Sequence, residues 1–237
     1  MCHGRDGSHA GKRKTLPAGN PHAANQTRKR VLKHGEKRRG TRTGIVIETE
    51  RLILRPWKKN KADAKALYQL AKDARIGPAA GWSVHKDPAH SLQIIRDILS
   101  TPDIYAVLRK SDPSARPGEK AGQGETLVGA AGITYAGTGR KWLGTHEAEI
   151  GYWIGVPYWG NGYAPEAVRA LLNRAFGELG MEKVWCGYYD GNEQSRAVQE
   201  KCGFVYDHTD YHAFNEELHE ERVEHFSVLT KSRYETL

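Results

Sequence analysis

The stretch WGNGYAPEA, residues 159–167, lies between a strand-like segment and a helical one. Its glycines, Gly160 and Gly162, let the backbone approach a ligand closely and adopt conformations closed to other residues. The first N–H groups of the helix predicted over 165–179 point at the same spot with the positive end of the helix dipole. The turn therefore predicts a cradle for an anion such as a pyrophosphate, although glycine-rich turns of this kind also occur for packing alone.

A dinucleotide-binding site does not fit this turn. The dinucleotide fingerprint requires a third Gly or Ala at the position held here by Pro165. It also belongs to an early strand–helix–strand unit, whereas strands and helices already precede residue 159 in this chain. We therefore expect the anion to belong to another kind of ligand.

The segments around the turn alternate between strand and helix patterns. Strand-like runs occupy residues 45–57, 104–109, 126–135, 146–154, 183–189, 204–211 and 223–230. Helical runs are predicted over 61–74, with Asn60 as its cap, over 165–179 and 192–201, and after Asp87-Pro88. This order indicates an α+β (mixed α/β) domain built on one sheet. About 190 residues after residue 45 are enough to form a core.

Charge is unevenly distributed along the chain. Of the 36 Lys and Arg residues, 12 lie in residues 1–44 beside only two acidic residues, whereas residues 45–237 hold 24 basic and 26 acidic residues. The first 44 residues lack aromatic side chains and cannot bury enough apolar surface to fold, so we expect a disordered basic tail. The tail is either a weak polyanion contact, a solvated extension or a misassigned start. The nearly neutral body argues against a nucleic-acid-binding domain.

Cysteine content and hydropathy suggest a cytoplasmic protein. Cys2, Cys186 and Cys202 are an odd number without metal-ligand spacing, which fits a reducing compartment and gives no disulfide framework. The longest apolar run, residues 127–133, is too short to span a bilayer, so no membrane contact is expected. Four histidines between 208 and 225 have no cysteine close enough to complete a familiar zinc set, and no metal is expected.

Three further segments, taken together with the glycine turn, match the sequence motifs of one protein family. They are ETERLILRPW (48–57), AEIGYWI (148–154) and NEQSRAVQEKCGF (192–204). In this order and spacing, the chain resembles the GNAT superfamily of acyl-CoA-dependent N-acyltransferases over about residues 46–230. It is most similar to the RimJ/RimL branch, whose members acetylate N-terminal amines of ribosomal proteins. The resemblance implies a single GNAT-like domain at 45–232, with a mostly antiparallel twisted sheet that splays between its fourth and fifth strands and is flanked by helices.

The resemblance also implies the residues that bind acetyl-CoA, the co-substrate. The family's pyrophosphate loop, R/Q-x-x-G-x-G/A, falls on Trp159, Gly162 and Ala164. Trp159 departs from the usual Arg or Gln, but the cradle of backbone N–H groups does not depend on that side chain. The fourth strand would contact the pantetheine arm through its edge, together with the Asn at the start of the later helix. The implied cofactor residues are Tyr152, Trp153, Ile154, Trp159, Gly160, Asn161, Gly162, Tyr163, Ala164, Asn192 and Ser195.

The catalytic residues are less directly implied. Many superfamily members protonate the departing thiolate with a Tyr where this chain has Gln199, which cannot act as an acid. In the RimJ/RimL pattern a Ser at the position of Ser195 is the donor, although Ser195 could also be an ordinary residue of a first helical turn. A Glu on the fourth strand accepts the amine proton through a water in many members. Here that Glu is Glu149, with Glu147 on the same strand face, and the alternative is an edge carboxylate.

The acceptor is a primary amine, for which the N-terminal α-amine of a peptide or protein is our first expectation. An α-amine of pKa ~8 is about 10% neutral at pH 7, whereas a lysine of pKa ~10.4 is only about 0.04% neutral, so an α-amine tolerates a weak base. A small-molecule amine, from an antibiotic or a metabolite, is one alternative. A non-catalytic acyl-CoA-binding module tethered by the basic tail is another. Acidic residues near the C-terminus either steer a cation or solvate a hairpin: Glu216, Glu217, Glu220, Glu221 and Glu224.

Overall fold

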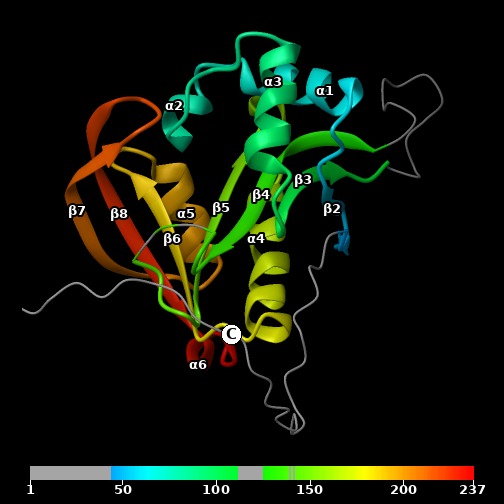
Figure 1. The fold of residues 1–237 in the computed structure, drawn as a ribbon. Coiled ribbons are helices and arrows are strands. Elements are labelled where there is room, and N and C mark those ends of the chain that lie inside the picture. The colour runs from blue at the N-terminus through cyan, green and yellow to red at the C-terminus, as the bar shows by residue number, and fades with distance from the viewer. Residues whose placement is uncertain (1–43, 112–124, 139, 141) are drawn as a thin grey trace, which may run out of the picture. The chain divides into compact units, whose positions relative to one another are not determined.

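A computed structural model describes residues 44–111, 125–138, 140 and 142–237 (Figure 1). The helices and strands all belong to one compact unit, Arg39–Leu237. The predicted disordered tail at 1–44 lies, apart from Gly44, outside the described residues. Most of the polar loop between residues 111 and 125 lies outside them as well.

The described strands form one eight-stranded sheet in the order β1-β2-β3-β4-β5-β6-β8-β7. All neighbouring strands are antiparallel except β5 and β6, which run parallel. The predicted mixed α/β fold with a mostly antiparallel sheet is confirmed. The strands are β1 (Ile47–Glu48), β2 (Leu52–Pro56), β3 (Ile104–Arg109), β4 (Thr126–Tyr135), β5 (Glu147–Ile154), β6 (Lys183–Tyr189), β7 (Val205–Asn215) and β8 (Glu220–Thr230).

Side chains cap the helices as the sequence indicates. The carboxamide oxygen of Asn60 accepts from the N–H of Asp63 at 2.9 Å, and the Asp87 carboxylate accepts from the N–H of His90 at 2.7 Å. The third and fourth helices continue as π-helical turns at Ile95–Leu99 and Arg174–Glu178. The helices are α1 (Lys61–Ala71), α2 (Gly77–Ala80), α3 (Pro88–Ile94), α4 (Tyr163–Asn173), α5 (Glu193–Lys201) and α6 (Lys231–Tyr234).

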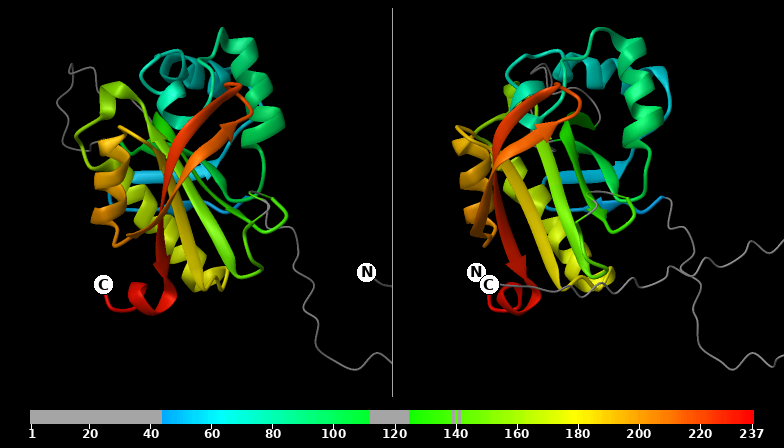
Figure 2. Two further views of the ribbon diagram at one scale, coloured as in Figure 1. Left: turned by 90° about the vertical axis from the view of Figure 1, so that its left-hand side faces the viewer. Right: turned by 60° about the vertical axis from the view of Figure 1, so that its left-hand side comes forward.

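The sheet is covered on both faces by helices (Figure 2). Successive residues of a strand point to opposite faces. On β3, Tyr105 and Val107 accordingly join the core beneath α4, while Ala106 and Leu108 join the core beneath α1 and α3. The three layers hold the strand ends rigidly, which matters because the site described below is built at one of those ends.

Three local expectations differ from the structure. The segment 45–57 is a hairpin rather than one strand, because Leu52 N–H donates to Thr49 Oγ1 at 2.9 Å and Thr49 N–H donates to the Leu52 carbonyl at 3.0 Å, which closes a turn. The short helix α2 was not predicted at all. Strand β8 begins at Glu220, three residues before the predicted strand at 223–230, so Glu220 and Glu221 belong to the strand as well.

The predicted splay is present between β5 and β6. These strands pair from Glu147↔Lys183 to Glu149↔Trp185 and then separate toward α2, as Figure 1 shows. They correspond to the fourth and fifth strands of the expected fold, because the first expected strand divides into β1 and β2. The gap that opens beyond Glu149 is where the site lies.

Candidate active site

A cavity of about 600 Å³ fills the gap between the splayed strands. Its walls come from β5, β6, α5, α2 and the glycine turn before α4. Among the predicted residues, only Asn161 does not line it. Those that do are Glu149, Tyr152, Trp153, Ile154, Trp159, Gly160, Gly162, Tyr163, Ala164, Asn192 and Ser195.

The edge of β5 presents backbone groups to this cavity. The Ile150 carbonyl accepts from the Cys186 thiol of β6 at 3.2 Å, and the Ile154 carbonyl accepts from the Trp159 indole N–H at 2.7 Å. Both carbonyls therefore point toward the gap. Since strand residues two apart have the same orientation, the backbone N–H and C=O of Tyr152 face the gap as well. They lie beyond the last paired register of β6, where an extended ligand can bind alongside the strand.

The glycine turn fits an anion. Gly160 and Gly162 have φ angles of 77° and 76°, in the left-handed region that favours glycine. A Cβ on Gly160 would have no heavy atom within 4 Å, so open space lies over the turn. Gly162 is the N-cap of α4, and the N–H groups of Tyr163 and Ala164 begin the helix there. The positive end of the α4 dipole therefore lies on the cavity wall.

Arg51, which sequence reasoning missed, supports the turn from outside. Its Nε donates to Glu166 in the first turn of α4 at 2.7 Å, and its Nη1 donates to the Asn161 carbonyl at 2.9 Å. Glu166 also accepts from Thr49 Oγ1 at 2.6 Å. The Asn161 amide donates to the carbonyls of Tyr158 and Trp159, so this side chain shapes the loop. The sequence signal for this contact is Glu166, an acidic residue near the N-terminus of a predicted helix.

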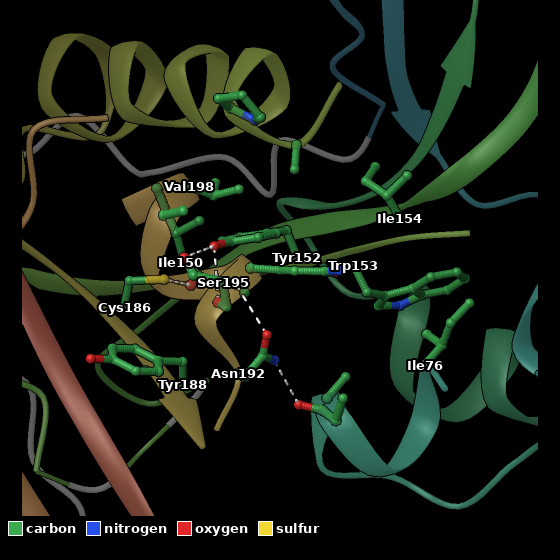
Figure 3. Close-up of a pocket in the computed structure, with 18 of the residues that line it drawn as sticks. Ile76, Ile150, Tyr152, Trp153, Ile154, Cys186, Tyr188, Asn192, Ser195 and Val198 are labelled. Carbon is green, nitrogen blue, oxygen red and sulfur yellow. Dashed lines mark hydrogen bonds between the residues drawn. The ribbon is translucent and has the colours of Figure 1, made fainter. Parts of the chain in front are cut away.

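A hydroxyl pair lies on the α5 side of the cavity (Figure 3). The Tyr152 hydroxyl donates to the Ser195 carbonyl at 3.0 Å and lies 3.0 Å from Ser195 Oγ. Burial is the main cause that raises the pKa of Tyr152, so this phenol keeps its proton. Gln199 Nε2 lies 3.4 Å from Ser195 Oγ as a donor. Because the single phenol proton goes to the Ser195 carbonyl, the Ser195 hydroxyl is the donor toward the Tyr152 oxygen, and a ligand in the cavity would receive this hydrogen bond in place of Tyr152.

Asn192 connects α5 to α2 across the cavity. Its Oδ1 accepts from the Ser195 N–H at 3.1 Å, and its Nδ2 donates to the Ala79 carbonyl at 3.3 Å, as Figure 3 shows. The Asn215 side-chain amide donates to the Gly81 carbonyl at 3.0 Å, and Arg222 Nη1 donates to the Pro78 carbonyl. The segment around α2 is thus fastened to the second half of the chain by side-chain donors. These contacts span more than a hundred residues, and no local pattern predicts them.

Glu149 has a different environment from Glu147. Glu149 accepts from Arg140 Nε at 3.0 Å and lines the cavity, and burial raises its pKa although Arg140 acts to lower it. Burial also acts to raise the pKa of Glu147, but hydrogen bonds from the Trp185 indole, Gly144 and Lys183 lower it overall. Glu147 does not line the cavity. Of these two carboxylates, Glu149 is the one with access to a ligand and with enhanced basicity.

The described part of the chain holds neither a metal-binding cluster nor a membrane-spanning helix. No group of three or more His, Cys, Asp or Glu residues there could hold a metal ion. No helix there is long and apolar enough to cross a membrane. Cys186 and Cys202 are both buried free thiols, as expected of core cysteines.

Comparison with known proteins identifies the family. Residues 51–205 match the acetyltransferase (GNAT) domain family. The chain belongs to the GNAT acetyltransferases. GNAT acetyltransferases transfer an acetyl group from acetyl-CoA to an amine. The cavity along β5 fits this donor, because an anion cradle and an unpaired strand edge lie on its wall.

Individual relatives agree with this assignment. The uncharacterized N-acetyltransferase YoaA of Bacillus subtilis is 25% identical over 159 residues, which cover 67% of this chain and 82% of YoaA. The B. subtilis protein named "Putative ribosomal N-acetyltransferase YdaF" is 39% identical over 82 residues, which cover 32% of this chain and 45% of YdaF. The crystal structure of a GNAT acetyltransferase from Bacillus anthracis has a TM-score of 0.63 at 21% identity, over 79% of this GNAT chain and 99% of that one. At that identity, the likeness concerns the fold.

Proposed function

We propose that this protein transfers the acetyl group of acetyl-CoA to the N-terminal α-amine of a peptide or protein, as RimJ/RimL enzymes do. One observation carries the proposal. A single cavity is lined by the anion cradle at Gly162–Ala164, by the Ser195 hydroxyl and by the partly buried carboxylate of Glu149. These are the three elements that donor binding, leaving-group stabilisation and amine deprotonation require.

The chain's own groups bind and orient the donor. The N–H groups at the start of α4 would hold the pyrophosphate, and the backbone of Tyr152 would bond the pantetheine arm along the edge of β5. Acetyl-CoA supplies an activated thioester. The Ile154 N–H has the same orientation as the backbone of Tyr152 and would polarise the thioester oxygen. The Trp159 side chain, bound to the Ile154 carbonyl, forms a wall rather than a phosphate contact.

The reaction is a direct transfer. The nitrogen lone pair of the acceptor forms the new C–N bond while the C–S bond breaks, and the electron pair of that bond stays on sulfur. Glu149 accepts the proton lost by the amine, directly or through a water. Ser195 donates a hydrogen bond to the sulfur as negative charge develops there, and CoA leaves as the thiolate.

Two facts favour an α-amine as acceptor. An α-amine is partly neutral at pH 7, so a carboxylate of raised pKa such as Glu149 suffices as its base. The relative YdaF is named for ribosomal N-acetylation and has the higher identity of the two relatives described above. The carboxylate of Glu224 on the cavity wall also suits an acceptor that arrives as a cation.

The test is thiol release from acetyl-CoA by the full chain. The acceptors are peptides with free N-termini, the same peptides with acetylated N-termini as matched controls, and small amines including polyamines. We expect turnover with free peptides and none with the blocked ones. Turnover with small amines alone would reassign the protein to small-molecule acetylation. No turnover with any acceptor, while CoA still binds, would favour a non-catalytic acyl-CoA-binding module.

A further inference from the structure

Arg140 is shared unequally between two carboxylates on the cavity wall, the buried Glu224 and the partly buried Glu149. Its terminal nitrogens Nη1 and Nη2 donate to Glu224 of β8 at 3.1 and 2.5 Å. Only its Nε faces Glu149 of β5, at 3.1 and 3.0 Å from the two carboxylate oxygens. Glu224 thus has the two-point contact characteristic of a strong arginine–carboxylate pair, while Glu149 shares a single N–H between two oxygens.

We propose that Glu224 is a positioning residue for acetyl transfer, which binds the terminal nitrogens of Arg140 so that Glu149 remains free to take the proton of the acceptor amine. This inference rests on the function proposed above. Sequence reasoning placed Glu224 only within a run of acidic residues. The structure separates it from that run, since it is 4% exposed and lines the cavity.

The charges of the three residues balance at each stage of this role. With both carboxylates ionised, Arg140, Glu149 and Glu224 carry a net charge of −1. An acceptor that arrives as an ammonium brings the total to zero. When its proton moves to Glu149, the pair Arg140–Glu224 remains and is neutral by itself. Once the acceptor has bound, no stage therefore leaves an unpaired charge at this end of the cavity, which would be costly.

The groups that face Glu149 are few in the part of the chain that the structure describes. They are Arg140 from the β4–β5 connection, Glu224 from β8, and the Cys186 thiol of β6, whose pKa is raised mainly by burial so that it stays uncharged. Burial raises the pKa of Glu149 most, Arg140 lowers it and the negative charge of Glu224 raises it. The negative charge of Glu224 thus raises the pKa of Glu149. This is the direction expected if Glu224 helps Glu149 to accept a proton.

Gly187 of β6 makes room for Glu224. A Cβ at this position would lie 2.7 Å from Glu224 Oε1, closer than side chains tolerate. Glycine within a strand interior usually marks the close approach of another group, and here that group is the Glu224 carboxylate. The space beside Gly187 therefore suits the inward-pointing side chain of Glu224. Gly187 pairs with Phe226, which lies two residues from Glu224 on β8.

The test compares Glu224→Gln and Arg140→Gln with the wild type. The pKa of Glu149 is followed by carbon NMR of its carboxylate, assigned by the signal lost in Glu149→Gln. Turnover is followed by the thiol-release assay across pH. We expect the Glu149 pKa to fall in Glu224→Gln and to rise in Arg140→Gln, with the acidic limb of kcat/KM moving in the same directions. At neutral pH, Glu224→Gln should lower kcat about tenfold, with an unchanged KM for acetyl-CoA.

Glu221→Gln is the matched control, because Glu221 lies on the same strand but is exposed and does not line the cavity. It should change neither readout. The proposal is overturned if the two test variants shift the Glu149 pKa in the same direction or not at all, or if Glu224→Gln retains wild-type turnover. If Glu224→Gln does not fold, Glu224→Asp takes its place, because the shorter side chain weakens the contact with Arg140 and the Glu149 pKa should again fall. A wild type that acetylates no amine would refute the proposed function, whereas the NMR titration judges the effect of Glu224 independently.

Discussion

Arg174 and Arg140 each bind a buried carboxylate, and their surroundings differ. Arg174, in the π-helical turn after α4, has a side chain 1% exposed and donates to Asp103, 5% exposed, at 2.5 Å. Arg140 is 37% exposed and lines the cavity together with Glu149 and Glu224. The first pair is enclosed by protein and fixes one arrangement of the chain. The second faces a cavity, where a ligand can alter the balance of charge.

The enclosed pair also holds a strained backbone. Asp103 has a φ of 63°, in the left-handed region, which costs a non-glycine residue about 1–2 kcal/mol. Its side chain accepts from the Tyr105 hydroxyl at 2.9 Å, and its carbonyl accepts from Ile133 N–H at 2.9 Å. These contacts join the π-helical turn after α4 to β3 and β4, and neither Arg174 nor Asp103 lines the cavity. The pair therefore serves the fold rather than the reaction.

The largest expected effect concerns this enclosed pair. Arg174→Met leaves Asp103 buried without its cation, and we expect the free energy of unfolding to fall by about 3–5 kcal/mol, measured by denaturant titration. Arg196→Met is the control, because Arg196 forms an exposed ion pair with Glu200 within α5. That control should leave the free energy of unfolding almost unchanged, because solvent screens an exposed ion pair. A loss below about 1 kcal/mol in Arg174→Met would show that the enclosed pair contributes no more to the free energy of unfolding than a surface ion pair does.

The second prediction concerns the open region. Ser195→Ala removes the hydroxyl that would stabilise the leaving sulfur, and we expect kcat to fall about 10²-fold while CoA still binds. Tyr152→Phe keeps the ring but loses the bonds to Ser195, so it should lower kcat by about tenfold at most. Steady-state thiol release and CoA titration measure both variants. Wild-type turnover in Ser195→Ala would show that the hydroxyl is only a residue of the first turn of α5.

Local sequence patterns predict one part of this site well. The glycines at 160 and 162 and the cap at Asn60 act on residues within a few positions, so their signals lie in short stretches. The contacts of Arg51 with the glycine turn and of Arg140 with Glu224 join residues 110 and 84 positions apart. Such pairs depend on the register and direction of whole strands, and one sequence does not fix these.

The family resemblance covers some of what local patterns miss. It implied the splay of the sheet and placed Ser195 and Glu149 as candidates, and the structure brings both to one cavity. It could not show that Asn192 bonds the Ala79 carbonyl of α2, because α2 itself has no strong sequence signal. It also treated Glu224 as one of several equivalent acidic residues. Tertiary packing alone distinguishes a carboxylate that is buried beside Gly187 from its exposed neighbours.

The smallest expected effect is a change of stability with unusual sign. Because burial raises the pKa of Glu149, the folded state favours its protonated form. Its contribution to stability is therefore greatest at low pH and is lost as pH rises through the folded pKa. Glu149→Gln mimics the protonated carboxyl at every pH, so we expect it to match the wild type in acid and to be equally or more stable at neutral pH.

Denaturant unfolding of both proteins across pH measures this difference, with Asp103→Asn as the matched variant from the enclosed pair. Asp103→Asn should destabilise at neutral pH, because it leaves the buried guanidinium of Arg174 without its counterion. If Glu149→Gln raises the free energy of unfolding at neutral pH and Asp103→Asn lowers it, the ionised Glu149 carboxylate destabilises the fold. This is expected of a group that is retained for activity. If Glu149→Gln instead destabilises as Asp103→Asn does, Glu149 is a structural partner of Arg140, and the proton acceptor for the amine must be sought elsewhere on the cavity wall.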